Sequence, residues 1–160
     1  MILAKTLLFT LLVPGAVVGA LPYWIARVDR SPMELGPARW LGVLPLLLGV
    51  FIYALCAFDF SVTGRGTPFP LDPPRVFVTR GLYRHVRNPM YVGVLLAILG
   101  QALLYESDAI FLYAASVWAG FHTVVLLYEE PTLAKRFAET YRLYRESVPR
   151  WIPRLGRKTA

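Results

Sequence analysis

Four long stretches of this chain contain no charged residue, and the polar residues gather between them. The uncharged stretches cover residues 6–26, 40–58, 89–105 and 109–128. Each is close to the length of about 20 apolar residues that an α-helix needs to cross the hydrocarbon core of a bilayer. The pattern therefore predicts an all-α integral membrane protein with about four transmembrane helices.

The first stretch has two interpretations. Lys5, a short apolar core and the small residues Val18-Gly19-Ala20 are arranged as in a secretory signal peptide. The apolar run nevertheless continues through Trp24 and Ile25, beyond that cleavage site, and reaches the length of a span. A retained first helix is therefore the preferred interpretation.

Composition agrees with a membrane protein. Of the 160 residues, 56% are hydrophobic, and the mean hydropathy is +0.51. A net charge of +7 would favour nucleic-acid binding in a soluble protein. Here the basic residues lie beside the apolar stretches, so membrane lipids with anionic headgroups are the expected partners, and nucleic acid is not. The single cysteine, Cys56, lies inside an apolar stretch and is expected to be a packing residue.

The basic residues also predict an orientation, because Lys and Arg are enriched in cytoplasmic loops. With four spans, Lys5, the five arginines from Arg65 to Arg87 and the eight basic residues from Lys135 onward share one side. The other side has only Arg27, Arg30 and Arg39. We therefore expect a multi-pass protein with both termini in the cytoplasm.

We expect a single membrane domain over residues 1–160. Two transmembrane helices fall in 1–60, a cytoplasmic loop in 61–88, a transmembrane hairpin in 89–128, and an amphipathic helix with a tail in 129–160. The loop from Asp59 is rich in proline and glycine, and it is either a lid that gates the substrate or a plain linker. The amphipathic helix is predicted from apolar residues at helical spacing, namely Leu133, Phe137, Tyr141, Tyr144 and Val148.

Polar chemistry gathers at residues 80–93, which read RGLYRHVRNPMYVG. Arg87-Asn88-Pro89 has the form of a helix start, with Asn88 as the capping residue and Pro89 at the first helical position. The free N–H groups of a first helical turn bind anions, and the planar Arg87 guanidinium matches a carboxylate. This stretch therefore predicts a binding site for a small charged ligand.

Glu129 and Glu130 lie at the end of the fourth apolar stretch, on the same predicted side of the membrane. Carboxylates at the edge of the hydrocarbon region are costly unless they meet a cation or a ligand. We interpret them as site residues that face the basic stretch. The alternative is structural: a salt bridge to the loop arginines, or Glu130 favouring the N-terminus of the helix that Pro131 opens.

The C-terminal half of the chain resembles the isoprenylcysteine carboxyl methyltransferases and their relatives, which include the phospholipid N-methyltransferases. The resemblance covers about residues 79 to 153. It depends on motifs in matching order and spacing, namely Gly81-x-Tyr83, Arg87-Asn88-Pro89-x-Tyr91-x-Gly93, Glu129-Glu130-x-x-Leu133, Phe137, Tyr141, Tyr144 and Val148-Pro149.

Two departures from the family pattern bear on the substrate. The prenylcysteine enzymes have Arg-His-Pro where this chain has Arg87-Asn88-Pro89, and asparagine does not titrate, so no proton transfer is assigned to Asn88. Thr123 and Leu127 occupy places where charged, substrate-contacting residues are expected in the eukaryotic enzymes. This second departure argues against prenylcysteine itself as the substrate and leaves the cofactor assignment intact.

The resemblance implies methyl transfer from S-adenosyl-L-methionine without a Rossmann fold, and the chain contains no Gly-x-Gly-x-x-Gly motif. It implies that Arg87 and the N–H groups behind Asn88 hold the methionine carboxylate. Glu129 and Glu130 would bind the amino group or the ribose hydroxyls, and one of them could orient the nucleophile. The remaining cofactor-binding candidates are Gly81, Tyr83 and Tyr91 beside the adenine or ribose, and Gly93, where the backbone could approach the cofactor. No metal site is predicted.

The sequence leaves the roles of three further features open. His122 lies seven residues before Glu129 on the same helical face, so it either points into the substrate path or is a hydrogen-bonded buried histidine. Arg150 either closes on the cofactor or binds a lipid phosphate. The small residues Gly93, Ala97 and Gly100 could form only a helix contact, with Gln101 bonded across it.

The function predicted from the sequence is methyl transfer to a lipophilic acceptor, either a prenylcysteine-like carboxylate, a lipid amine or an apolar thiol. The catalytic candidates are Arg87, Glu129 and Glu130. The alternative is a non-catalytic four-helix scaffold or lipid-binding assembly factor.

Overall fold

The computed structural model describes residues 12–29, 33–62 and 79–153 of the chain. These ranges contain helices, turns and no strand, which confirms the predicted all-α fold class. A π-helical turn, Gly15–Ala20, precedes the first α-helix, and a 3-10 helix, Gly36–Gly42, precedes the second. The α-helices are α2 (Leu21–Val28), α3 (Val43–Val62), α4 (Pro89–Leu104), α5 (Asp108–Val124) and α6 (Glu130–Ser147).

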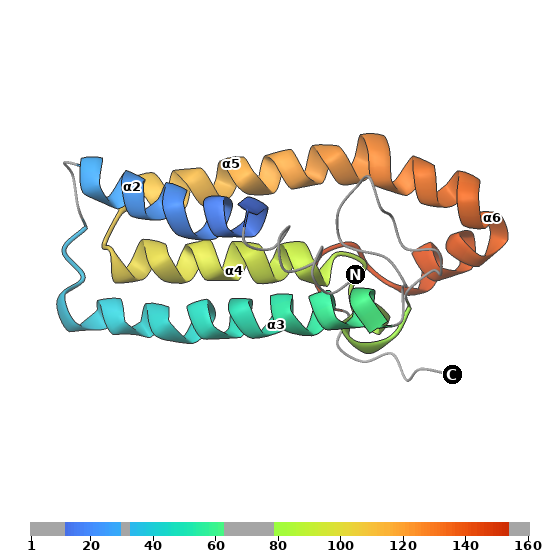
Figure 1. Ribbon diagram of the computed structural model, residues 1–160, viewed down its shortest axis with the longest axis horizontal. Helices are drawn as coiled ribbons and strands as arrows, with labels where there is room; N and C mark the ends of the chain where they lie inside the picture. Colours follow the sequence, from blue (N-terminus) through green and yellow to red (C-terminus); the bar gives the residue numbers. More distant parts are fainter. Residues whose placement is uncertain (1–11, 30–32, 63–78, 154–160) are drawn as a thin grey trace.

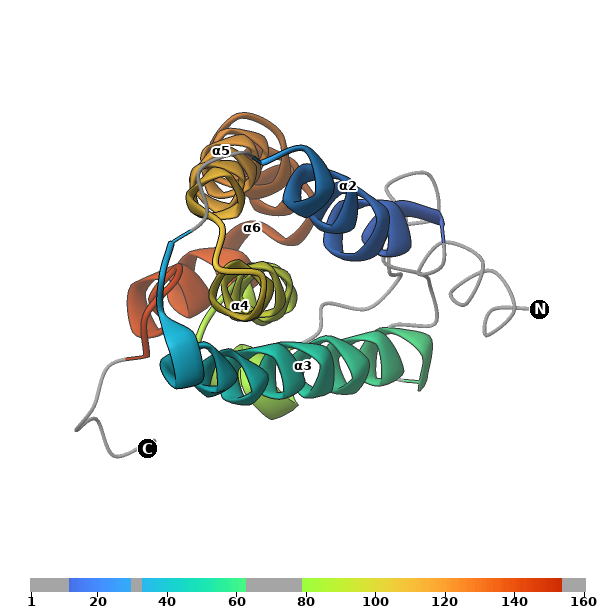
Figure 2. The same cartoon turned by 90° about the vertical axis from the view of Figure 1, so that its left-hand side faces the viewer.

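The helices form an antiparallel bundle with α4 at its centre. Seen end-on, α4 lies between α3 on one side and the pair of α2 and α5 on the other (Figure 2). The α4–α5 hairpin predicted from the turn at residues 106–108 is present (Figure 1). The start of α4 and the whole of α6 therefore lie at one end of the bundle, and the α4–α5 turn lies at the other.

Glycines bring α3 and α4 into close contact. A Cβ atom at Gly49 would clash with the backbone of Gly93 and Ala97, and one at Gly100 would lie 2.6 Å from the Gly42 carbonyl oxygen. Small residues at such positions let two helix backbones approach closely, which is the usual way in which membrane helices pack. Gly93, Ala97 and Gly100 therefore form a helix contact.

The rest of α3 is apolar and faces outward. Among the described residues of α3 and the 3-10 helix before it, only Gly42, Gly49 and Cys56 are buried. Between them, Leu44 and Leu47 expose 74% and 62% of their surface. An apolar helix that exposes this much surface is suited to lipid and not to water.

Two helices are long and apolar enough to cross a bilayer by length and composition, Gly36–Asp59 and Asp108–Ser147. The other two predicted spans correspond to the shorter apolar helices Leu12–Val28 and Pro89–Leu104. Predictions for residues 6–11 and for most of the Asp59–Arg80 loop lie outside the described residues, and so does the question of a gating lid.

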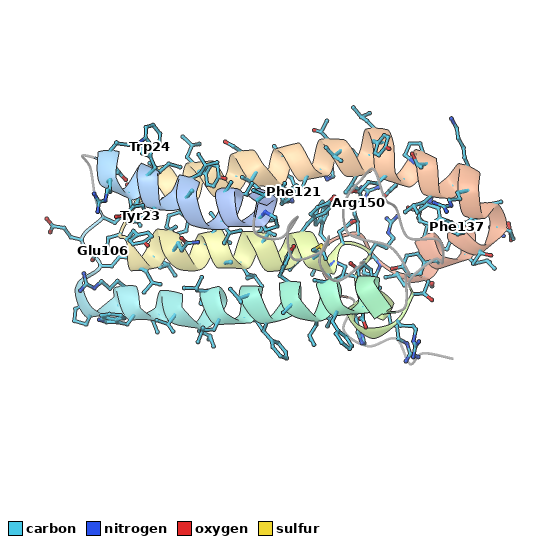
Figure 3. The ribbon with its side chains drawn as sticks, in the orientation of Figure 1. Tyr23, Trp24, Glu106, Phe121, Phe137 and Arg150 are labelled. Atoms are coloured by element: carbon cyan, nitrogen blue, oxygen red, sulfur yellow. The ribbon has the colours of Figure 1, made fainter. Side chains whose placement is uncertain are left out.

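Polar contacts fasten the end of the bundle that is distant from α6. Ser107 caps α5 by accepting a hydrogen bond from the Ile110 N–H, and its hydroxyl donates to Asp29 at the end of α2. The Glu106 carboxylate accepts hydrogen bonds from the N–H groups of Leu35 and Gly36, at 2.9 and 2.8 Å. Tyr23, Trp24 and Glu106 lie at this end, far from Phe137 (Figure 3). These contacts hold α2, α3 and the hairpin together away from the candidate site.

The helix after the fourth span is not the continuous amphipathic helix expected from its apolar spacing. A π-helical turn, Val125–Glu129, joins α5 to α6, and α6 breaks at Ala138, where φ is 40° and ψ is −114°. The first part of α6 extends past the bundle, and the second part folds back to it (Figure 1). The predicted helix is therefore present but broken, and after the break the Tyr144 hydroxyl donates a hydrogen bond to the Tyr83 carbonyl oxygen at 2.6 Å.

Candidate functional site

The two predicted halves of the site meet at the end of the bundle formed by the start of α4 and by α6. Arg87 directly precedes the helix start at Asn88-Pro89, and Glu130 is the first residue of α6. The Arg87 guanidinium lies 2.9 Å from the Glu130 carboxylate. Segments about 40 residues apart in sequence therefore share one site, as helix topology allows.

Glu130 is held by two arginines. Besides Arg87, Arg150 donates two hydrogen bonds to the Glu130 carboxylate, from Nε at 2.7 Å and from Nη2 at 3.1 Å. The side chains of Arg87 and Glu130 are each only 11% exposed, so their charges are poorly screened by water. The hydrogen bond from Arg150 to Glu130 raises the pKa of the Arg150 guanidinium above its ordinary value. Two positive charges thus face the Glu130 carboxylate, and the neighbouring Glu129 supplies a second carboxylate to the site.

One donor of Arg87, Nε, has no hydrogen-bond partner among the described residues. Its NH1 donates to Glu130 and, at 3.5 Å, to the Tyr141 hydroxyl. Its Nε is buried and makes no hydrogen bond with any part of the chain that the structure describes. Buried donors are rarely left unbonded, so this atom is a place where an anionic ligand fits.

The structure confirms the predicted helix start and corrects the role of Asn88. The helix begins at Pro89, with Asn88 before it, but the Asn88 side chain caps no N–H group of α4. Its amide instead donates to the Arg150 carbonyl oxygen at 3.2 Å. The Arg87 N–H likewise donates to the Pro149 carbonyl oxygen at 2.9 Å. Asn88 therefore ties the start of α4 to the C-terminal segment through its side-chain N–H donor and does not cap the helix through its side-chain oxygen.

Glu129 faces a different neighbour from Glu130. Its carboxylate accepts a hydrogen bond from the Tyr91 hydroxyl, one turn into α4. The Tyr91 ring stacks on Phe121 of α5, with centroids 4.3 Å apart. Consecutive residues point to different partners because they stand about 100° apart on a helix. The π-helical turn ends at Glu129, and such turns are frequent at functional sites.

Aromatic side chains continue from Tyr91 towards the middle of α5. Trp151 lies 6.5 Å from Tyr91 and 6.0 Å from His122, measured between ring centroids. Its indole N–H donates to His122 Nδ1 at 3.1 Å, and the other face of His122 stacks on Trp118. We call Tyr91, Trp118, Phe121, His122 and Trp151 the aromatic wall.

Comparisons with known proteins identify the family. The sequence profile described as phospholipid methyltransferase matches residues 37–140. The chain belongs to the phospholipid methyltransferase family. A methanethiol S-methyltransferase 2 of Bradyrhizobium diazoefficiens is 35% identical over 88% of this chain and 57% of its own length.

Two protein-S-isoprenylcysteine O-methyltransferases are also similar to this member of the phospholipid methyltransferase family. The Schizosaccharomyces pombe protein is 37% identical over 49% of this chain and 33% of its own length. The human protein is 30% identical over 85% of this chain and 50% of its own length. The chain thus spans only about a third to somewhat over half of these curated relatives.

Three predicted site residues lie against α3 and not beside the ion pairs that Glu130 makes with the two arginines. They are Gly81, Tyr83 and Gly93. Gly93 faces Gly49, as described above. Gly81 has φ +55°, and a Cβ there would lie 2.5 Å from a carboxylate oxygen of Asp59. Tyr83 packs on Cys56, and burial holds the pKa of its hydroxyl well above the ordinary range, so it stays neutral. These residues fix the position of the loop that carries Arg87.

The structure adds residues that sequence reasoning did not assign to the site, Trp151, Phe121 and Trp118. All three are aromatic, which is common in membrane helices and at interfaces, so composition alone does not distinguish them. Only their positions in the sequence could have indicated a place in the site: Phe121 precedes His122, and Trp151 follows Val148-Pro149-Arg150.

Proposed function

We propose that this protein transfers a methyl group from S-adenosyl-L-methionine to a lipophilic acceptor at the cytoplasmic face of a membrane. The observation that carries the proposal is the contact of Arg87, at the start of α4, with Glu130 beside Glu129. The buried Arg87 Nε, which no described group bonds, belongs to the same observation. Membership of a methyltransferase family supports the reaction class.

The residues present fit the cofactor chemically. The free Arg87 Nε and the uncapped N–H groups at the start of α4 would hold the methionine carboxylate. Glu129 would accept hydrogen bonds from the amino group or the ribose hydroxyls, and Glu130 would balance the two arginines. When bound, the cofactor supplies an electrophilic sulfonium methyl group.

Such a transfer needs positioning and exclusion of water more than strong acid or base, because the positive charge is dispersed in the transition state. The site suits this need. Arg87 and Glu130 are largely shielded from water, and the aromatic wall adjoins them on the apolar side. The acceptor, a prenylcysteine-like carboxylate, a lipid amine or an apolar thiol, would enter sideways from the bilayer.

The orientation belongs to the same proposal. The end of the bundle with Arg87 and α6 also has most of the described basic residues, and the opposite end has the aromatic residues Tyr23, Trp24 and Trp40 with few cations. Lys and Arg mark the cytoplasmic side and Trp and Tyr mark membrane interfaces. This distribution supports a multi-pass protein with both termini in the cytoplasm.

A scaffold without catalytic activity is the second candidate, and one observation favours it. Glu130 is already satisfied by Arg87 and Arg150, as a purely structural ion cluster would be. The two candidates differ in whether the site binds a nucleotide.

Binding of S-adenosylhomocysteine to the detergent-purified protein separates the two candidates. We expect binding by calorimetry, and Arg87→Ala or Glu129→Ala should weaken it by at least about 1.5 kcal/mol, the lower range for a hydrogen bond to a charged group. Arg142→Ala is the matched control, because Arg142 pairs with Glu139 and Glu146 on the exposed face of α6. No binding, or equal binding by all three variants and the parent, would favour the scaffold.

A further inference from the structure

The hydrogen bond between Trp151 and His122 determines where the histidine carries its proton. The indole N–H of tryptophan donates and never accepts. It lies 3.1 Å from His122 Nδ1, so that nitrogen must supply its lone pair and cannot carry a hydrogen. Neutral imidazole has one N–H group, which therefore stands on Nε2.

His122 occupies the apolar side of the site. It lies seven residues before Glu129, about 10 Å along a helix, and thus deeper in the fourth apolar stretch. Trp118 stacks on it at 5.2 Å, and Trp151 connects it to Tyr91, which bonds to Glu129. Trp151 also follows Arg150 directly in the sequence, so an arginine that binds Glu130 and a member of the aromatic wall are adjacent residues. The residues that would hold the cofactor's carboxylate therefore adjoin the aromatic wall that contains His122.

Building on the proposed function, we propose that His122 presents Nε2–H as a hydrogen-bond donor to the acceptor's nucleophilic atom, and that this atom is an anionic sulfur or oxygen and not an amine nitrogen. Trp151 is a positioning residue, because it acts by fixing the tautomer of His122.

The electron balance explains the choice of acceptor. In the transfer, the bond from the sulfonium sulfur to the methyl carbon breaks with its electron pair remaining on sulfur. A lone pair of a carboxylate, or of a thiolate whose proton has already passed to water, forms the new bond to that carbon, so the transfer itself moves no proton. An alkanethiol and an alkylammonium both give up a proton to water before they react, and a hydrogen bond from His122 Nε2–H then stabilises the anionic thiolate more than the neutral amine.

Three acceptors with the same alkyl chain test the selectivity: decanethiol, decanoate and decylamine, each with S-adenosyl-L-methionine and the detergent-purified protein. We expect kcat/KM for decanethiol or decanoate to exceed that for decylamine by about tenfold or more, the effect of one hydrogen bond to a charged group. Preference for decylamine, or methylation of none of the three by protein that still binds S-adenosylhomocysteine, would overturn the inference and leave the proposed function standing.

Substitutions at His122 separate a donor from a packing residue. His122→Ala should lower kcat/KM for the preferred anionic acceptor by about tenfold or more, and His122→Gln, which keeps a side-chain N–H, should recover most of it. Both variants should bind S-adenosylhomocysteine as the parent does, which also shows that they fold. Equal activity of His122→Ala and the parent, or no recovery by His122→Gln, would contradict the donor role.

A spectroscopic measurement tests the tautomer without activity. The chain has two histidines, so protein labelled with 15N-histidine gives two imidazole patterns, and His85→Gln assigns them. We expect His122 to carry its hydrogen on Nε2 in the parent and to lose that preference in Trp151→Phe, which keeps an aromatic ring but removes the donor. A hydrogen on Nδ1 in the parent, or an unchanged pattern in Trp151→Phe, would refute the assignment.

Discussion

Glu130 lies between two guanidinium groups in a place that water hardly reaches. Its removal leaves Arg87 buried without a counter-charge, and breaking one partner of a buried pair costs about 3–5 kcal/mol. We therefore expect Glu130→Ala to lower the free energy of unfolding by about that much. Reversible unfolding in mixed detergent micelles, followed by tryptophan fluorescence, measures it.

The control for this prediction is Glu146→Ala. Glu146 also pairs with an arginine, Arg142 at 2.7 Å, but its side chain is 59% exposed. Exposed pairs contribute about 0–1 kcal/mol, so this variant should stay close to the parent. Equal losses for the two variants would mean that burial does not set the strength of the Glu130 cluster.

At this scale the sequence predicted which residues meet but not how they bond. Arg87 and the glutamates were predicted to meet because the charge pattern places them on one side of the membrane. Glu129 and Glu130 bond to different partners in a register set by the π-helical turn that ends at Glu129. The Asn88 side chain donates to the Arg150 carbonyl oxygen of the C-terminal segment. Both are tertiary effects that local spacing does not encode.

Among the elements, α6 contains a strained residue. Ala138 has φ 40° and ψ −114°, in a region that L-residues avoid and glycine tolerates. Such strain costs of order 1–3 kcal/mol, so Ala138→Gly should stabilise the protein by about 1 kcal/mol. Ala134→Gly, in the regular part of the same helix and equally exposed, should instead cost about 0.5–1 kcal/mol. Opposite signs in the same unfolding assay confirm the break, and a loss in both variants would contradict it.

The contact between α3 and α4 gives a second pair of opposite effects. A Cβ at Gly49 would clash with the backbone of α4, which no side-chain rotation relieves, so Gly49→Ala should destabilise by about 1–3 kcal/mol. At Gly120 nothing lies within 4 Å of the added carbon. Gly120→Ala should therefore stabilise α5 by about 0.5–1 kcal/mol, through helix propensity alone. The same unfolding measurement applies, and tolerance of Gly49→Ala would mean that the helices are farther apart.

The elements themselves were largely predictable. The four uncharged stretches and the turn at 106–108 located the helices and their antiparallel order, because apolar length and short turns leave few alternatives. The break at Ala138 was not predictable, since alanine is a strong helix former and neither proline nor glycine marks the place. The close α3–α4 contact was only one interpretation of a stripe of small residues until both helices were seen together.

For the whole molecule, the bundle has two unlike ends, and the proposed function requires the one with Arg87 and Glu130 to face the cytoplasm. Cysteine labelling tests this, because the single natural cysteine, Cys56, is fully buried and contributes little background. Glu34→Cys and Thr140→Cys place exposed thiols at opposite ends. In intact bacterial cells, a membrane-impermeant maleimide should label position 34, and it should label position 140 only after permeabilisation, because positive residues remain inside. Labelling of position 140 from outside would put the site on the other face of the membrane, away from cytoplasmic S-adenosyl-L-methionine, and would refute the proposed orientation even if the site binds the cofactor in detergent.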